Sequence, residues 1–171
     1  MNLITDRLRL RPVKPEDAAW IFPMMGDPEV MAFWDVGAID DPEIIDAMIA
    51  HQIAETAARR AYYWAIERLS DDTPLGECDL SEIDRRHRRA EVGFILRREA
   101  WGEGLAAEAM AAVVNFAIDL GLKRLGARTH VANDASARLL RKLGFDEEGV
   151  LRGHVERDGE RRDCRLFGLL L

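Results

Sequence analysis

Cysteine, long apolar runs and excess positive charge are all scarce in this sequence. The two cysteines, Cys78 and Cys164, lack the spacing of a metal or redox motif, so we expect reduced, buried thiols and a cytoplasmic protein. No apolar run approaches the ~18 residues of a membrane span, and residues 2–7 contain neither region of a signal peptide. The formal charge of −7 disfavours nucleic acid as a partner and favours a cationic one.

The composition is that of an ordinary globular protein. With 171 residues, 48% of them hydrophobic and 32% charged, the chain fits one domain with a buried core. No repeat, linker or low-complexity segment divides it. We therefore expect residues 1–171 to form a single domain.

The first part of the chain alternates strand and helix signals. Arg7 to Val13 alternates charged and apolar residues, which predicts a half-buried strand. Proline and acidic residues at 15–17 and again at 40–43 predict the starts of a short helix and of a longer one that ends near Arg60. Residues 62–68, 73–83 and 88–96 then indicate three antiparallel strands joined by short turns.

The second part predicts a crossover between two parallel strands. Apolar residues recur at helical spacing after residue 104 and predict a helix, which Gly121 ends. These apolar residues are Leu105, Ala109, Met110, Val113, Val114, Phe116, Ile118 and Leu120. Residues 123–131 form the next strand, which a right-handed crossover places parallel to 88–96. Asn133 or Asp134 caps a short helix that Gly144 ends. Residues 146–152 and 162–170 form a hairpin around Asp158-Gly159. The fold class is α+β, with a mixed sheet of about seven strands and about four helices.

Two glycines stand where the central helix begins. Gly102 and Gly104 lie between a strand end and a first helical turn, where backbone N–H groups lack partners and the helix dipole is positive. Bare main chain there either binds an anion such as phosphate or simply forms a turn. The pattern is neither the dinucleotide fingerprint nor a Walker loop, so the glycines alone leave both interpretations open.

Five stretches spread along the chain carry a more specific signal. They are TDRLRLRPVKPEDA, DPEVMAFW, AEVGFIL, WGEGLAAEA and NDASARLLRKLGF, followed by EEG and RDCRLFGLLL. In this order and spacing they resemble the GNAT superfamily of acyl-CoA-dependent N-acyltransferases, and within it the branch of ribosomal-protein N-terminal acetyltransferases. The resemblance covers residues 1–171. It implies a GNAT fold with a V-shaped splay between the two central parallel strands, at Glu91–Leu96 and Leu125–Val131.

The resemblance also implies an activity and its partners. We expect an acetyl-CoA-dependent N-acetyltransferase in which a primary amine, either a protein N-terminal α-amine or a small-molecule amine, attacks the CoA thioester directly. No metal is implied, and the protein is a monomer or a homodimer. The alternatives are a relative with another acyl donor and a CoA-binding sensor or scaffold without catalysis. A nucleotide-binding protein ranks third, because no lysine or magnesium ligand follows the glycines.

The resemblance assigns residues to acetyl-CoA. Backbone amides from Gly102 to Ala107 bind the pyrophosphate, because Trp101 replaces the usual Gln or Arg and offers no charge. Arg97, Arg98 and Arg138 are candidates for the missing positive charge, or solvated surface residues. The open edge of the strand at 94–96 pairs with the pantetheine amides. The implied set is Phe94, Ile95, Leu96, Trp101, Gly102, Glu103, Gly104, Leu105, Ala106, Ala107, Asn133, Ser136 and Arg138.

Acetyl transfer requires a neutral amine, so we expect a base that removes a proton from the acceptor amine. Glu91 is the first candidate, because a charged residue on the central strand next to the splay indicates a functional role. It can instead point outward and pair with an arginine such as Arg89. Asp79 and Glu77 on the neighbouring strand and His130 are rivals for the role.

Other residues are candidates for holding the pantetheine arm, for protonating the leaving thiolate and for lining the acceptor cleft. Asn133 follows the strand end where the superfamily holds pantetheine, and it can also cap the helix. The tyrosine that many relatives use to protonate the thiolate is Leu140 here, so Ser136 is the substitute, unless the thiolate leaves unassisted. Trp34, after Phe33, is expected as a wall of the acceptor cleft or as plain core. The resemblance implies that loops 30–42 and 152–162 are the variable parts of the fold, so the sequence does not identify the acceptor.

Overall fold

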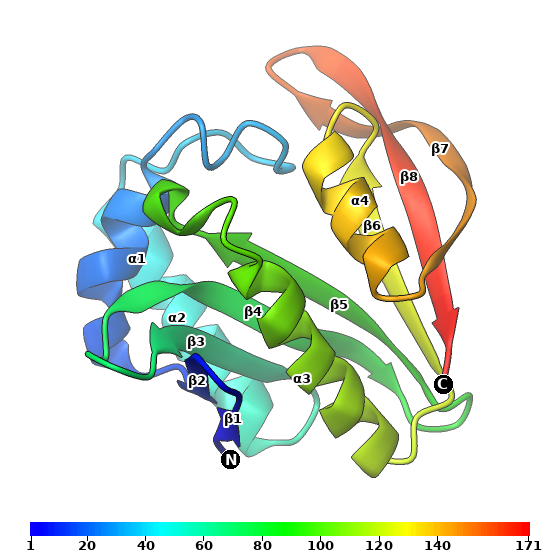
Figure 1. Ribbon diagram of the computed structural model, residues 1–171. Helices are drawn as coiled ribbons and strands as arrows, with labels where there is room; N and C mark the ends of the chain where they lie inside the picture. Colours follow the sequence, from blue (N-terminus) through cyan, green and yellow to red (C-terminus); the bar gives the residue numbers. More distant parts are fainter.

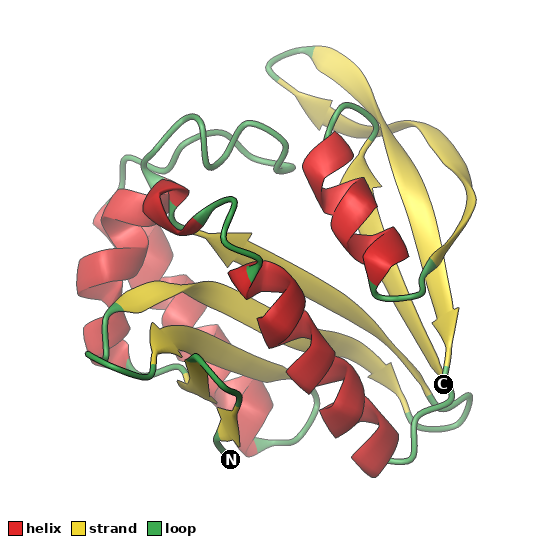
Figure 2. Ribbon diagram, viewed as in Figure 1, coloured by secondary structure: helices red, strands yellow, loops and turns green.

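The computed structural model describes residues 1–171 as one mixed sheet with four α-helices (Figures 1 and 2). The elements follow in the order β1 (Leu3–Ile4), β2 (Leu8–Pro12), η1 (Pro15–Asp17), α1 (Ala18–Met25), α2 (Pro42–Ala57), β3 (Tyr62–Arg68), β4 (Pro74–Asp84), β5 (Arg89–Leu96), η2 (Arg98–Ala100), α3 (Leu105–Asp119), β6 (Arg124–His130), α4 (Asp134–Lys142), β7 (Asp146–Arg157) and β8 (Glu160–Leu170). The expected α+β class is confirmed. No helix has both the length and the apolar content to cross a membrane.

The sheet divides at its one parallel pair. The strand order is β1-β2-β3-β4-β5-β6-β8-β7, and every neighbouring pair is antiparallel except β5 and β6. These two strands pair only at Arg89–Arg124, Ala90–Leu125 and Glu91–Gly126, and then separate. Figure 1 shows the result: β1 to β5 lie in one lobe, β6 to β8 lie in the other, and β5 and β6 diverge. The predicted splay is therefore present.

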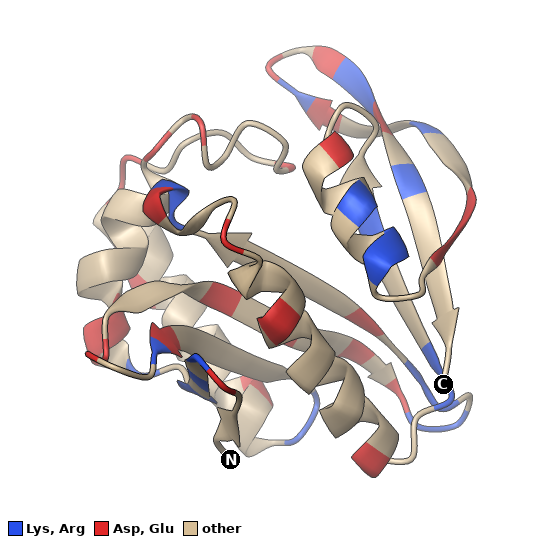
Figure 3. Cartoon of the chain, viewed as in Figure 1, with Lys and Arg blue, Asp and Glu red and all other residues tan.

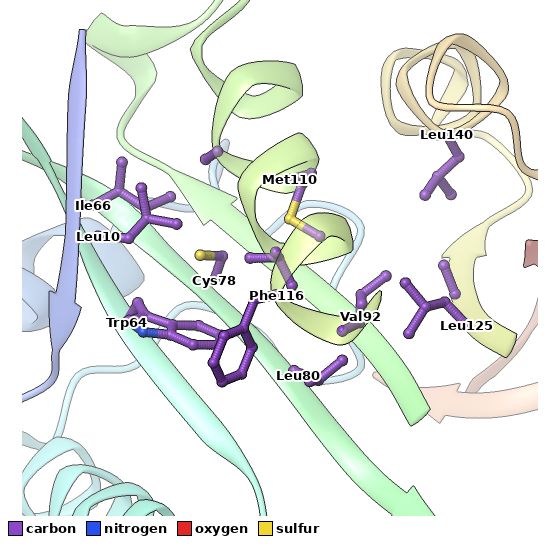
Figure 4. Close-up of a cluster of buried hydrophobic side chains, with 14 of the residues drawn as sticks. Leu10, Trp64, Ile66, Cys78, Leu80, Val92, Met110, Phe116, Leu125 and Leu140 are labelled. Carbon is purple, nitrogen blue, oxygen red and sulfur yellow. The ribbon is translucent and has the colours of Figure 1, made fainter. Parts of the chain in front are cut away.

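Helix α3 packs on one face of the sheet and α1 and α2 on the other. The main core has 24 buried residues, among them Met110 and Phe116 of α3, which point at the side chains of β2 to β6 (Figure 4). The Phe116 ring makes edge contacts with Tyr62 and Trp64, at centroid distances of 4.9 and 5.2 Å. A second cluster of nine buried residues lies under α1 and α2 and includes Ile95. Alternate residues of β5 thus face opposite sides of the sheet.

Local capping signals place the helix ends. The Asp41 carboxylate accepts from the Glu43 N–H at 2.9 Å at the start of α2, and Asn133 caps α4 in the same way. Gly121 and Gly144 follow α3 and α4 in left-handed conformation, with φ of 78° and 90°. Both cysteines are buried and free, as expected.

Three expectations need correction. The sheet has eight strands, since Leu3–Ile4 adds a short edge strand that is too brief for a periodic signal. Residues 152–162 are not a loop, because β7 and β8 continue to a two-residue turn at Asp158-Gly159, both with positive φ. Ile118 and Leu120 are 50% and 37% exposed, so the buried stripe of α3 is narrower than its apolar pattern.

Removing the Phe116 ring should destabilise the protein by about 3–5 kcal/mol, because it leaves a cavity between α3 and the sheet. Ile118→Ala is the matched control on the same helix and should change the free energy of unfolding by well under 1 kcal/mol, as expected of an exposed side chain. Urea denaturation of Phe116→Ala and Ile118→Ala measures both. Equal losses in the two variants would contradict this packing of α3.

Candidate active site

A cavity of about 960 Å³ lies at the gap between β5 and β6. Val92 and Leu96 line it from the face that α3 covers, whereas Asp79, Glu91 and Ile95 line it from the face of α1 and α2. Because both sets belong to one cavity, the gap connects the two faces of the sheet. Figure 3 shows acidic segments on β4 and β5 and basic segments on α4, which borders the gap.

The cavity collects nearly all the residues expected to bind acetyl-CoA. Those lining it are Phe94, Ile95, Leu96, Trp101, Gly102, Gly104, Leu105, Ala106, Ala107, Asn133, Ser136 and Arg138. Trp34 and Glu91 line it as well. Glu103 does not, because its side chain is exposed outside the cavity. Residues from three separate parts of the chain are thus brought together.

The loop before α3 presents unpaired donors. The backbone of Gly102 and Gly104 lies in the left-handed region, with φ of 80° and 76°. Residues other than glycine rarely adopt this conformation. None of the six N–H groups of residues 102–107 donates a hydrogen bond within the protein, and the first to do so is Glu108 N–H, to the Gly104 carbonyl at 3.2 Å. These donors stand at the positive end of a 15-residue helix. The loop therefore suits a diphosphate group such as that of CoA.

The N-terminal segment holds this loop from outside the cavity. Arg7 donates from Nη1 to the Glu103 carbonyl at 3.1 Å and from Nε to the Glu108 carboxylate at 2.7 Å. The same carboxylate accepts from the Arg7 N–H at 2.9 Å and from the Thr5 hydroxyl at 2.5 Å. Sequence reasoning missed this brace, because residues about a hundred positions apart form it.

The expected arginines have different surroundings. Arg98 pairs with Asp27 and Glu29, at 3.3 and 2.8 Å, and Arg97 donates to the Pro74 carbonyl. Of the three, Arg138 alone lines the cavity. Trp101 donates from its indole nitrogen to the Leu96 carbonyl at 3.0 Å, which fixes the ring at the cavity wall without adding charge.

Asn133 and Ser136 lie at the start of α4. The Asn133 side-chain Oδ1 accepts from the Ser136 N–H at 3.1 Å, so the expected capping role is real. The side-chain N–H₂ group donates no hydrogen bond within the protein. The Ser136 hydroxyl has no hydrogen-bond partner in the protein and lines the cavity. Leu140 lines the same cavity and has no donor.

Asp79 and Glu91 line the cavity from the face opposite the glycine loop. Asp79 is partly exposed and lies against Gly93 of β5, where any side chain would collide with the carboxylate. Burial raises the pKa of Asp79 to about 6; the charge of Glu91 acts in the same direction and a hydrogen bond from Ser81 opposes it. Partial burial also raises the pKa of Glu91, which Arg124 and Arg89 counteract.

The surroundings of Glu91, Glu77 and His130 differ. Glu91 forms no ion pair, and the neighbouring Arg89 instead contacts Asp84 at 3.5 Å. Glu77 is buried and does not line the cavity. His130 lines it, but its Nδ1 accepts from the Ala132 N–H at 3.0 Å, and burial, together with the charge of nearby arginines, lowers the pKa of the ring.

A loop held by arginines borders the cavity. Arg128 of β6 pairs with Asp35 through two contacts of 3.0 and 2.7 Å. Arg157 of β7 donates to the carbonyls of Met31 and Trp34, at 2.7 and 3.1 Å. The exposed Trp34 ring, next to Phe33, thereby stands at the cavity, as expected of a cleft wall. The arginines gave no sequence signal, because their partners are distant in the chain.

Known proteins share this arrangement. A family model described as an acetyltransferase (GNAT) domain matches residues 7–146. The uncharacterized N-acetyltransferase YoaA of Bacillus subtilis is 34% identical over 98% of this chain and 96% of its own. A spermidine N-acetyltransferase from Vibrio cholerae, solved with CoA and spermine, has a TM-score of 0.86 at 21% identity, covering 97% of this chain and 96% of that one.

A further solved structure has the same fold. The acetyltransferase that modifies the N-terminal serine of ribosomal protein L7/L12 from Salmonella typhimurium has a TM-score of 0.90 at 16% identity, covering 100% of this chain and 99% of that one. Fold, cavity and sequence similarity thus agree. This chain belongs to the GNAT acetyltransferase family and is an N-acetyltransferase that transfers an acetyl group to an amine.

Proposed function

We propose that the cavity binds acetyl-CoA with its diphosphate on the N–H groups of residues 102–107. The observation that carries this proposal is the run of six unpaired donors next to the gap in the sheet. Each hydrogen bond to a charged acceptor contributes ~1.5–3 kcal/mol, so a few of them suffice for micromolar binding. Arg138 of α4 adds positive charge to the same cavity.

The acyl arm then follows β5 into the gap. Beyond Glu91 the edge of β5 that faces β6 has no strand partner, so it can pair with the pantetheine amides as an added strand does. The free side-chain N–H₂ group of Asn133 faces the same cavity and is a further donor for the arm. This path brings the thioester from the α3 face to the face where the carboxylates lie.

The amine enters from that opposite face and attacks the thioester carbonyl directly. The ammonium first gives one proton to a carboxylate, and the neutral amine then attacks. A C–N bond forms, the C–S bond breaks, and the thiolate takes a proton from Ser136 or from water. The nitrogen loses its second proton to water, which replaces the proton that the thiolate took. We assign the base to Asp79, with Glu91 as the rival. A carboxyl with a pKa of about 6 is ionised at neutral pH and is a stronger base than an ordinary aspartate.

The acceptor is a primary amine that arrives as a cation. Relatives of this fold were solved with spermine or act on a protein N-terminal serine, and both present an ammonium group. The acidic residues Asp79, Glu82 and Glu91 at the cavity favour such a group. An α-amine with a pKa of ~7.8 loses its proton far more readily than a side-chain amine at ~10.4, so the latter depends more on the base. We also propose a cytoplasmic location, consistent with two free thiols.

The direct test is thiol release from acetyl-CoA in the presence of pooled polyamines or of peptides with free N-termini. We expect turnover with one of these classes, seen as CoA thiol and confirmed as an acetylated amine by mass spectrometry. Binding of acetyl-CoA without turnover of any amine would instead support a sensor or scaffold role.

Gly104→Val should weaken CoA binding by about tenfold or more, because a β-branched residue cannot keep φ positive and the loop amides would turn away. Gly121→Val is the matched control: it also has positive φ, at the other end of α3, with open space around it. Calorimetric titration with CoA compares the two variants. Equal affinity in Gly104→Val and the wild type would remove the loop from the binding site.

Asp79→Asn should lower kcat by about 100-fold, as expected for loss of a general base, and abolish the acidic limb of the pH profile. Glu91→Gln should lower kcat by less than about tenfold, since that carboxyl acts only through its charge. Steady-state rates between pH 5 and 9 measure both effects. A larger loss in Glu91→Gln than in Asp79→Asn would reverse the assignment.

A further inference from the structure

Two buried polar side chains under α2 have incomplete hydrogen bonding. Gln52 of α2 and Glu77 of β4 are 6% and 5% exposed, and the Gln52 side-chain N–H₂ group donates to Oε1 of Glu77. The remaining oxygens, Oε1 of Gln52 and Oε2 of Glu77, are both buried and accept no hydrogen bond. Unpaired buried acceptors are uncommon in native proteins, because each loses its contact with water.

The charges around Glu77 make an ionised carboxylate there unfavourable. The charges of Asp79 on β4 and Asp17 on η1 act on Glu77, and Tyr63 on β3 lies close enough for the charges of Glu77 and of Glu55 on α2 to act on it. Asp17 is already paired with Arg11, at 2.6 Å, and no cation contacts Glu77. The neighbouring Glu67 shows the contrast, since Arg11 binds its carboxylate at 2.7 Å.

One proton accounts for both orphan oxygens. A protonated Glu77 carries an O–H that can donate to Oε1 of Gln52, while its other oxygen keeps accepting from the amide. Acid and amide are then joined by two hydrogen bonds and neither carries charge. In agreement, burial raises the pKa of Glu77 to about 8; the charge of Asp79 adds to this shift and the bond from Gln52 opposes it.

We infer that Glu77 is a neutral acid paired with Gln52. This pair keeps a second negative charge away from Asp79, which is the ionised carboxyl at the cavity two residues along β4. Residues two apart on a strand face the same side, so a charge on Glu77 would repel the one on Asp79. Glu77 is thus a positioning residue that acts through Asp79. This inference rests on the proposed function of Asp79 as the base, but the proton on Glu77 can be measured without turnover.

Glu77→Gln tests the proton through stability. An acid whose pKa is higher in the folded chain binds more protons there, so the free energy of unfolding falls between the unfolded pKa of ~4.3 and about 8. The variant keeps both hydrogen bonds and does not titrate. Its Tm relative to the wild type should therefore rise by about 10 °C between pH 5 and pH 8. A constant difference over this range would overturn the inference.

Glu67→Gln is the control, because it replaces a buried carboxylate on the next strand that does have a cation. It should lower the Tm at pH 8, where Glu77→Gln raises it. Isotope-edited infrared spectra give the direct readout: the wild type at pH 7 should show a protonated carboxylic acid band that Glu77→Gln lacks. Identical spectra would also overturn the inference.

The pH profile tests the link to Asp79. Glu77→Ala breaks the pair and should lower both Tm and kcat. Glu77→Gln keeps the pair, so its Tm and kcat should not fall in this way, and the acidic limb of its pH profile should lie within about 0.3 pH units of that of the wild type. If Glu77 were ionised, the glutamine would instead lower the pKa of Asp79 and move the limb to lower pH. Absence of turnover in the wild type would refute the proposed function while leaving the infrared result interpretable.

Discussion

The parallel pairing of β5 with β6 ends after three residue pairs, and the rest of the site depends on that ending. Two adjacent strands of one sheet normally satisfy each other's backbone groups, so an open edge inside a protein calls for another partner. Here the gap also connects the two faces of the sheet. A long substrate arm can enter on the α3 face while an amine approaches from the other face, next to Asp79.

Helix α3 couples the stability of the fold to the site. Its later turns bury Met110 and Phe116 in the main core, and its first turn exposes the unpaired N–H groups of residues 105–107. Glu108, in that first turn, is bound by Arg7 and Thr5 of the N-terminal segment. The loop amides are therefore held in place by packing at one end of the helix and by hydrogen bonds at the other, before any ligand arrives.

Sequence reasoning succeeded where the determining chemistry is local. Caps such as Asp41, left-handed glycines such as Gly104 and the Asp158-Gly159 turn specify element ends within a few residues, so the order of strands and helices and the glycine loop could be predicted. The assignment of site residues relied further on family resemblance. The partners of Arg157 and Glu77 could not be predicted, because they lie on elements far away in the chain. Such contacts exist only once the sheet is assembled.

The central claim is that the backbone amides of residues 102–107 and the open edge of β5 hold CoA. Amide chemical shifts of ¹⁵N-labelled protein during a titration with CoA test it most directly. The account predicts the largest shifts at Gly102 to Ala107 and at residues 92–96, with saturation at one equivalent. Unmoved signals there, with large shifts at a distant surface such as the arginine-rich turn at 85–89, would contradict it.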